Sequence, residues 1–489
     1  MKADRLAAVL LTFVILLMSA SCGADSGNGP VTTAPEASEP PQETALTEIT
    51  EVRPELPGSD FGGYVFRVVK YDIEKQQWTG LINDIAVEAE NGDVLNDAVY
   101  RRNLLVQEKY NFSISDKAVA DVSSVLRQMV LAGTYDYDAV FQETLDFGKL
   151  LLGGYLTDLY GLPLINWEYP WWDHASAESL AIKGKLFGIF SDITLIDKYS
   201  TYITMFHKGM AESYGLPDLY QTVLDGGWTI DRMTELSRDV SKDLNGDGIY
   251  DRKDVYGIAC QNDGLYILMH GCGAKFAEPD GNGIPTDIFG KEKTITTVQK
   301  IVSVMTDPQL YFNRQVFSMT VQECIDMFSN NQALFFIRPL QTVEVLRSME
   351  NDYGIIPIPK YAEEDTEYHC TINKWTASIM CVPLLVEDPA RTAAILEELA
   401  AESHYTVMPA YYKTVLGEKI VRDEESGGML DLIFASRMYD IGYLYDFGKF
   451  CDTLMTTISK TNDANISSLY AANQTVIQKA IDDFIAAIE

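Results

Sequence analysis

Apolar residues along the chain alternate between the spacing of a strand and the spacing of a helix. Residues 64–70 follow the turn-forming pair Gly62 and Gly63 and predict a strand. Between Val122 and Val130 apolar residues recur at i, i+3, i+4, i+7 and i+8, which predicts a helix. A second strand is predicted at residues 138–141. This order predicts an α/β fold in which helices cover a parallel sheet and ligands bind at the carboxyl ends of strands.

More elements follow than one small sheet can hold. Thr229 is the expected N-cap of a helix with apolar positions Met233, Leu236 and Val240, and residues 466–485 form an amphipathic C-terminal helix. No fixed-period repeat is present, which excludes solenoids and propellers. Further strands are predicted at residues 186–189, 202–206, 333–337, 353–358 and 378–382.

The N-terminus carries an export signal, predicted at residues 1–21. Lys2 and Arg5 are followed by an apolar run at residues 6–18, which is too short for a permanent membrane helix. The small residues directly before Cys22 resemble the bacterial lipoprotein signal, which implies that Cys22 becomes the first mature residue and carries lipid. An ordinary cleavage site before a cysteine is the alternative. Either way the protein is expected to be exported, at the cell surface or in the periplasm.

Composition then separates a linker from a folded body. Residues 22–60 hold six of the 18 prolines and eight acidic residues but no aromatic residue, which predicts a disordered linker. The 489 residues allow two or three domains. The formal net charge of −33 excludes nucleic acid as a partner, because that affinity rests on Lys and Arg.

A loop at residues 243–254 has the EF-hand pattern of oxygen ligands for Ca²⁺. A glycine stands at position 6, where the loop must turn sharply, but Asp254 stands at position 12 in place of the usual glutamate. We expect a structural Ca²⁺ site between the Met233 helix and the strand that begins at Tyr256, and a metal-free polar turn is the alternative. The expected ligands are Asp243, Asn245, Asp247, the backbone carbonyl of Ile249, Asp251 and Asp254.

The order of several segments resembles the extracellular solute-binding proteins of bacterial ABC importers, in the class similar to maltose-binding protein. The segments are YDAVFQETLDFGKLLLGGYLTDL (137–159), GKLFGIF (184–190), WTIDRMTELSRDVSKDLNGDGIYDRKDVYGI (228–258), MFSNNQALFFIRP (327–339), YGIIPIPK (353–360) and RDEESGGMLDLI (422–433).

This resemblance implies two hinged α/β lobes with a ligand cleft between them. One lobe would comprise residues 61–192 and 376–440, and the other residues 193–375 and 441–489. The protein would be a monomer that captures a small solute, with a sugar or oligosaccharide as the leading candidate. It would pass that solute to an ABC importer permease, while the lipid on Cys22 holds it to the membrane.

Candidate ligand contacts are aromatic residues and polar residues at strand ends. Indole faces suit the apolar faces of sugar rings, although a tryptophan can equally pack in the core. The resemblance places polar contacts directly after the strands at residues 138–141 and 333–337. The candidates are Gln142, Glu143, Trp171, Trp172, Arg338 and Trp375.

No motif of catalysis accompanies these candidates. The chain contains no nucleophile elbow, zinc-helix motif or phosphate-binding glycine loop, so we predict a binding protein rather than an enzyme. A secreted carbohydrate-active enzyme is the alternative, because a pair of glycosidase carboxylates can come from distant positions.

Overall fold

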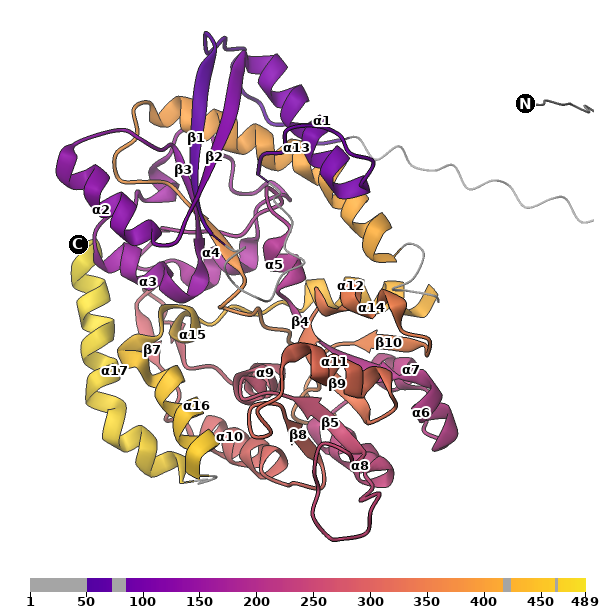
Figure 1. The fold of residues 1–489 in the computed structure, drawn as a ribbon. Helices are drawn as coiled ribbons and strands as arrows, with labels where there is room; N and C mark the ends of the chain where they lie inside the picture. Colours follow the sequence, from indigo (N-terminus) through magenta and orange to yellow (C-terminus); the bar gives the residue numbers. More distant parts are fainter. Residues whose placement is uncertain (1–50, 73–84, 417–423, 462–464) are drawn as a thin grey trace, which may run out of the picture. The chain divides into compact units, whose positions relative to one another are not determined.

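Two separate β-sheets organise the part of the chain that the structure describes. This computed structural model describes residues 51–72, 85–416, 424–461 and 465–489, and both sheets belong to the unit formed by residues 53–489. Cys22 and the export signal lie outside the described residues. Figure 1 shows the strands in two groups, one in indigo to purple with a single orange strand and the other in magenta to orange.

The first sheet has the strand order β11-β3-β1-β2. Strands β1 (Tyr64–Tyr71), β2 (Phe112–Val119) and β3 (Ala139–Glu143) run parallel, and β11 (Ser378–Cys381) pairs antiparallel with β3. Helix α1 (Val94–Tyr110) connects β1 to β2 and packs along the long helix α13 (Pro389–Leu416). Helices α2 (Val122–Ala132) and α3 (Thr144–Leu152) complete this region.

The second sheet has the order β10-β4-β9-β5-β8. Strands β9 (Ala333–Pro339), β5 (Tyr256–Cys260) and β8 (Tyr311–Asn313) are parallel neighbours, whereas β4 (Tyr202–His207) is antiparallel to β9 and to β10 (Tyr353–Ile356). The three parallel strands therefore end at the same edge, where the pattern predicted ligands to bind.

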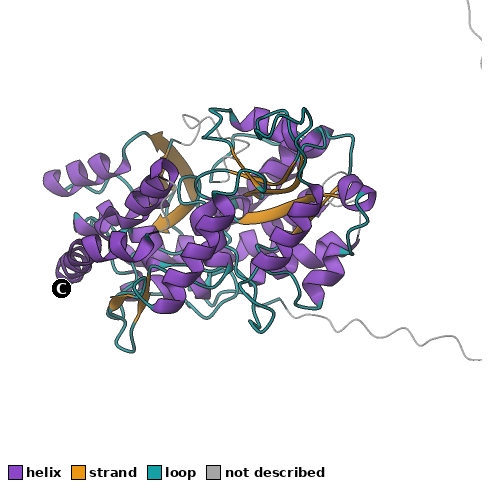
Figure 2. Ribbon diagram, turned by 90° about the horizontal axis from the view of Figure 1, so that it is seen from below, coloured by secondary structure: helices purple, strands orange, loops and turns teal. Residues whose placement is uncertain are grey.

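The remaining elements surround these sheets, and Figure 2 shows the helices around the strands. In chain order they are α4 (His174–Leu180), α5 (Ile196–Tyr199), α6 (Lys208–Ser213), α7 (Leu219–Leu224), α8 (Ile230–Val240), α9 (Gly264–Gly271), β6 (Ala277–Pro279), β7 (Pro285–Asp287), α10 (Glu292–Met305), α11 (Val321–Ser329), α12 (Thr342–Val345), α14 (Glu424–Ala435), α15 (Ile441–Tyr445), α16 (Phe450–Thr461) and α17 (Ile466–Ile488), with short 3₁₀ turns at Leu159–Gly161, Leu346–Ser348 and Phe447–Lys449.

The α/β class is confirmed, but two predictions from the apolar pattern, a parallel sheet and a strand at residues 186–189, were wrong. The sheets are mixed rather than parallel, because the chain passes from one sheet to the other before β4 and back before β11, and these entering strands pair antiparallel. Residues 186–189 form no strand, since only Ile189 bridges to Met380 of β11.

The two segments that pass between the sheets lie side by side. Thr201 bridges to Ile372, the Asn373 amide donates to the Ser200 carbonyl at 2.8 Å, and the Ser200 and Thr376 hydroxyls are 2.9 Å apart. The segment around Thr201 leads from the first sheet into β4 of the second sheet. The segment around Ile372 leads from the second sheet back into β11 of the first sheet. The two sheets are therefore joined through a short, hydrogen-bonded double connection.

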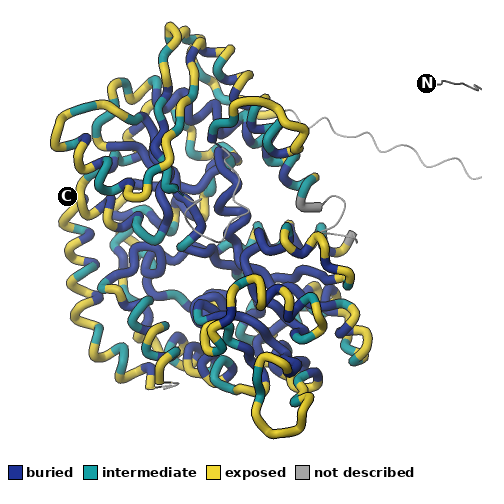
Figure 3. Tube along the Cα trace, viewed as in Figure 1, coloured by how far each residue is buried: buried dark blue, intermediate teal, exposed yellow. Residues whose placement is uncertain are grey.

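Buried residues, dark blue in Figure 3, fill the interior around both sheets. The six cysteines from Cys260 to Cys451 are free and buried. Among the described residues, every helix is too short or too polar to span a membrane.

Candidate ligand-binding site

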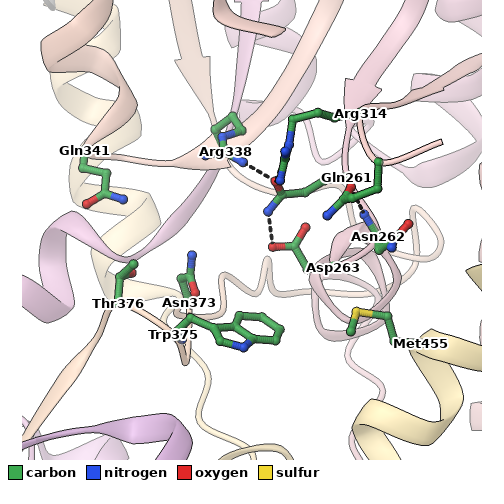
Figure 4. A pocket seen from close by; sticks show the side chains of 11 residues that line it. Gln261, Asn262, Asp263, Arg314, Arg338, Gln341, Asn373, Trp375, Thr376 and Met455 are labelled. Atoms are coloured by element: carbon green, nitrogen blue, oxygen red, sulfur yellow. Dashed lines mark hydrogen bonds between the residues drawn. The ribbon is translucent and has the colours of Figure 1, made fainter. Parts of the chain in front are cut away.

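A cavity of about 350 Å³ lies where the three parallel strands of the second sheet end. Figure 4 shows its side chains. The second sheet supplies seven of the lining residues: Gln261, Asn262 and Asp263 after β5, Arg314 and Gln315 after β8, and Arg338 and Gln341 at and after the end of β9. The connecting segment before β11 supplies Asn373, Trp375 and Thr376, and α16 supplies Met455.

Close packing fixes the strand ends that form one wall of the cavity. A Cβ atom on Gly257 would lie 2.1 Å from the Ser237 Cβ, so only glycine lets β5 approach α8 this closely. A Cβ atom on Gly264 would lie 2.0 Å from the Tyr311 hydroxyl, which donates to the Gln261 carbonyl at 2.9 Å. The start of α9, the residue after β5 and the first residue of β8 are thereby held together beside the cavity.

Gln261 is the hydrogen-bonding centre of this wall. Arg338 Nη1 donates to Gln261 Oε1 at 2.6 Å, and Arg314 donates to the same oxygen through Nε and Nη2, at 3.2 Å each. The Gln261 Nε2 donates in turn to Asp263 Oδ2 at 2.6 Å, as the dashed lines of Figure 4 indicate. Two guanidinium groups thus share one neutral amide oxygen.

Asp263 is the only carboxylate among the residues that line this cavity. Burial raises its pKa, although the Tyr202 hydroxyl that donates to Oδ2 and the nearby Arg338 oppose that shift. Its Oδ1 has no hydrogen-bond partner, and the same holds for Arg338 Nε and Gln341 Oε1. Such buried polar atoms cost about 1–3 kcal/mol each when left unpaired, so this wall is suited to a polar ligand.

The connecting segment supplies the opposite, aromatic wall. The Trp375 amide donates to Asn373 Oδ1 at 2.9 Å, and the Thr144 hydroxyl, directly after β3, donates to the Lys374 carbonyl at 2.8 Å. The first sheet therefore positions Trp375 against the polar groups of the second sheet. In Figure 4 the indole ring lies across the cavity from the two arginines.

Two of the predicted ligand contacts, Arg338 and Trp375, meet in this cavity. Gln142 and Glu143 lie at the end of β3 and are buried outside it. Trp171 and Trp172 lie in the hydrophobic core, where the Trp172 Nε1 donates to Glu397 Oε2 at 2.9 Å. A ligand contact by these four residues stays a prediction that this cavity does not support.

The sequence reasoning did not name Gln261, Asp263 or Arg314. They directly follow strands β5 and β8, so the rule that selected Arg338 after the strand at residues 333–337 would have found the first two. Arg314 was harder to find, because β8 has only three residues and gives little strand signal.

A second cavity of about 680 Å³ lies away from these strand ends, beside α4, α7 and α14. Its partly buried Arg437 is neutralised by Asp197 at 2.6 Å and Asp173 at 2.5 Å. The charge there is satisfied within the protein, so the cavity at the ends of β5, β8 and β9 is the better candidate for a ligand.

The predicted calcium loop is an exposed turn between α8 and β5. Both Asp243 oxygens accept backbone hydrogens, from Gly246 at 2.8 Å and from Gly248 at 2.7 Å, and the two glycines have φ of 73° and 81°. The buried Asp254 accepts from Leu244 at 2.9 Å. No group of three or more acidic, His or Cys side chains in the described residues is arranged to hold a metal. The Ca²⁺ site therefore stays a prediction.

Comparison with known proteins identifies the fold. Neither a protein-family model nor a curated protein matches the chain. A cyclo/maltodextrin-binding protein solved with maltotetraose is 12% identical, and the match covers 88% of this chain and 97% of that protein with a TM-score of 0.54. The chain has the two-domain fold of the solute-binding proteins. This confirms the fold that the resemblance predicted.

Other solved structures with this fold bind different solutes. An ABC substrate-binding protein from Listeria monocytogenes, solved with cycloalternan, is 10% identical over 87% of this chain and 99% of its own, with a TM-score of 0.52. UgpB from Mycobacterium tuberculosis, solved with glycerophosphocholine, is 14% identical over 86% and 98%, with a TM-score of 0.53. The fold is therefore shared by proteins solved with cycloalternan, with maltotetraose and with glycerophosphocholine.

Proposed function

We propose that the chain is an extracellular solute-binding lipoprotein that captures a small solute, a sugar or short oligosaccharide, between two hinged lobes for an ABC importer. The observation that carries the proposal is the cavity at the strand ends, where Trp375 faces a wall of hydrogen-bonding side chains. An aromatic face opposed to convergent polar groups matches the two kinds of surface on a sugar ring. The cavity volume of about 350 Å³ is within the usual range for small-molecule sites.

The composition of the cavity favours binding over glycoside hydrolysis. A glycosidase needs two carboxyl groups about 5 to 9.5 Å apart. Among the described residues that line the cavity, Asp263 alone carries a carboxylate. Solved proteins of this fold hold cycloalternan and maltotetraose as bound ligands, which supports capture of an intact solute.

A Trp375 variant tests this function. A panel of mono- and oligosaccharides is added to the protein, and we expect one-to-one binding in calorimetry with a change of tryptophan fluorescence. Trp375→Ala should weaken binding at least about five-fold, because stacking on an aromatic ring contributes roughly 1 kcal/mol or more. Trp167→Phe, at a partly buried ring outside the cavity, is the matched control.

Recovery of the bound sugar completes that experiment. Mass spectrometry should find it chemically unchanged after incubation. A cleaved product would contradict the binding function and favour the enzyme. Equal affinity in wild type and Trp375→Ala would contradict this cavity as the site.

Two further features belong to the proposal. The loop at residues 243–254 would hold a structural Ca²⁺ ion through Asp243, Asn245, Asp247, the Ile249 carbonyl, Asp251 and Asp254, supported by its ligand pattern and its two left-handed glycines. Cys22 would carry the lipid that holds the protein at the membrane, supported by the small residues before it.

A further inference from the structure

Positive charge exceeds negative charge in the cavity at the ends of β5, β8 and β9. Arg314 and Arg338 are the cations among its lining residues and Asp263 is the anion, so the cations outnumber the anion by one. Both guanidinium groups direct N–H donors at the neutral oxygen of Gln261. No ion pair of the described residues includes Arg338, and its Nε lacks a hydrogen-bond partner although the residue is only 6% exposed.

The surroundings do not remove this excess. Asp263 Oδ2 is occupied by donors from Tyr202 and Gln261, both neutral, and its pKa is raised, chiefly by burial. Lys374, behind Trp375, is itself paired with Asp446 at 3.8 Å and Asp452 at 3.5 Å, so those carboxylates serve another cation. Arg338 therefore has no carboxylate partner of its own among the described ion pairs, and Arg314 adds a second positive charge to the same cavity.

A buried cation without a partner is costly, and proteins keep one where a ligand neutralises it. The arrangement is more notable because the whole chain carries a net charge of −33, which repels anions at long range. Guanidinium groups match the planar oxygens of a carboxylate and the oxygens of a phosphate through two parallel hydrogen bonds. A neutral sugar would need hydrogen-bond donors here, but it would not need two cations.

We propose that the captured solute carries an anionic oxygen group, a carboxylate or a phosphate ester, which the Arg314 and Arg338 guanidinium groups bind while Trp375 stacks on the sugar ring. This inference rests on the proposed function and narrows its substrate class to acidic carbohydrates. Asp263 and Gln341 supply acceptors for hydroxyl groups, because each keeps an unpartnered oxygen at the cavity.

Matched pairs of sugars that differ in charge test the proposal. The full mature chain is dialysed against an equimolar mixture of glucose with glucuronate, galactose with galacturonate, digalacturonate with its dimethyl ester, and glucose 6-phosphate. Mass spectrometry identifies the retained solute, and calorimetry gives its affinity. We expect the charged member of a pair to bind at least about ten-fold more tightly than its neutral partner. Retention of uronates or of the phosphate ester shows which anionic group is preferred.

Variants connect that preference to the arginines. Arg338→Gln should remove most of the preference for the charged member, whereas Arg338→Lys, which keeps the charge, should preserve its sign at lower affinity. Arg347→Gln, at an exposed arginine outside the cavity, makes the same change in net charge and should behave as wild type. Circular dichroism checks that each variant is folded.

The outcomes separate the inference from the function on which it rests. If neutral members are retained as well as or better than charged ones, the inference is overturned and the binding function stands. If no member of the mixture is retained, both are contradicted. If Arg338→Gln and Arg338→Lys keep the full charge preference of the wild type, the arginines are not its source and the proposal falls.

Discussion

At the scale of single residues, Glu397 shows how burial changes an acid outside the cavity. Its side chain on α13 is fully buried, one carboxylate oxygen accepts from the Trp172 indole, and the other has no partner. Burial raises its pKa to about 7, and the hydrogen bond from Trp172 only partly opposes that shift. The folded protein therefore favours protonated Glu397. Its stabilising contribution is complete below the unfolded pKa of about 4.3 and is lost as the pH rises through about 7.

We expect Glu397→Gln to reduce the pH dependence of stability in that interval. Wild type should lose on the order of 2 kcal/mol of unfolding free energy between pH 5 and pH 8 from this group, and the variant should not. Urea denaturation at the two pH values measures the difference. Glu387→Gln, at an exposed acid just before α13, should keep the wild-type dependence. Identical pH profiles for wild type and Glu397→Gln would show that Glu397 titrates normally.

The predicted ligand contacts show what a sequence can indicate about a binding site. Arg338 was predictable because it ends an uninterrupted apolar strand, and strand ends are where ligands bind. Trp171 and Trp172 could not be separated from Trp375 by sequence, since an indole ring suits a core and a sugar equally well. Burial and partners distinguish them, and both depend on segments far away in the chain.

At the scale of elements, apolar patterning found strands that are buried on both faces, such as β9, and missed β2, which is not. Strand β9 is buried at all seven positions, whereas β2 exposes alternate residues and includes Ser113, Ser115, Asp116 and Lys117. An edge strand with polar residues resembles a loop in sequence. Pairing in register with β1, from Tyr64 opposite Phe112 onward, defines it in the structure.

The loop between α8 and β5 carries the prediction at this scale. If it binds Ca²⁺ with a dissociation constant of about 10⁻⁴ to 10⁻³ M, then 10 mM Ca²⁺ should add roughly 1.4 to 2.7 kcal/mol of stability. We expect the melting temperature to rise by a few degrees on addition of Ca²⁺ and to fall in chelator. Asp247→Asn should abolish this response, since it removes a charged ligand while keeping the oxygen that accepts from Ile249.

Asp280→Asn is the matched control for the loop. Asp280 also accepts backbone hydrogens in an exposed turn, from Asn282 at 2.8 Å and Ile284 at 2.9 Å, but it has no calcium-ligand pattern around it. The Asp280→Asn variant should therefore show the same rise in melting temperature with Ca²⁺ as the wild type. An equal melting temperature of wild type in Ca²⁺ and in chelator would contradict the site and favour a metal-free turn.

At the scale of the molecule, hydrophobic spacing predicts an α/β class but not the division of strands between two sheets. Buried strands such as β4 and β9 look alike whichever sheet they join, and their partners are distant in sequence. The order of segments, which resembles the solute-binding proteins, supplied that division. The lobe limits at residues 192 and 376 stay predictions, although the chain does pass between the sheets before β4 and before β11.

The last prediction at this scale concerns the membrane anchor proposed for the chain. Its net charge of −33 opposes contact with anionic lipids, and the described residues contain no helix that could cross a bilayer. We propose that attachment to a membrane depends on the lipid on Cys22, as the small residues before that cysteine suggest. We expect Cys22→Ser to move the protein from the membrane fraction to the soluble fraction, with loss of the diacylglyceryl mass at the mature N-terminus. Ser26→Ala, in the same linker, should stay with the membrane, and a Cys22→Ser protein that still sediments with membranes would show that something other than this lipid anchors it.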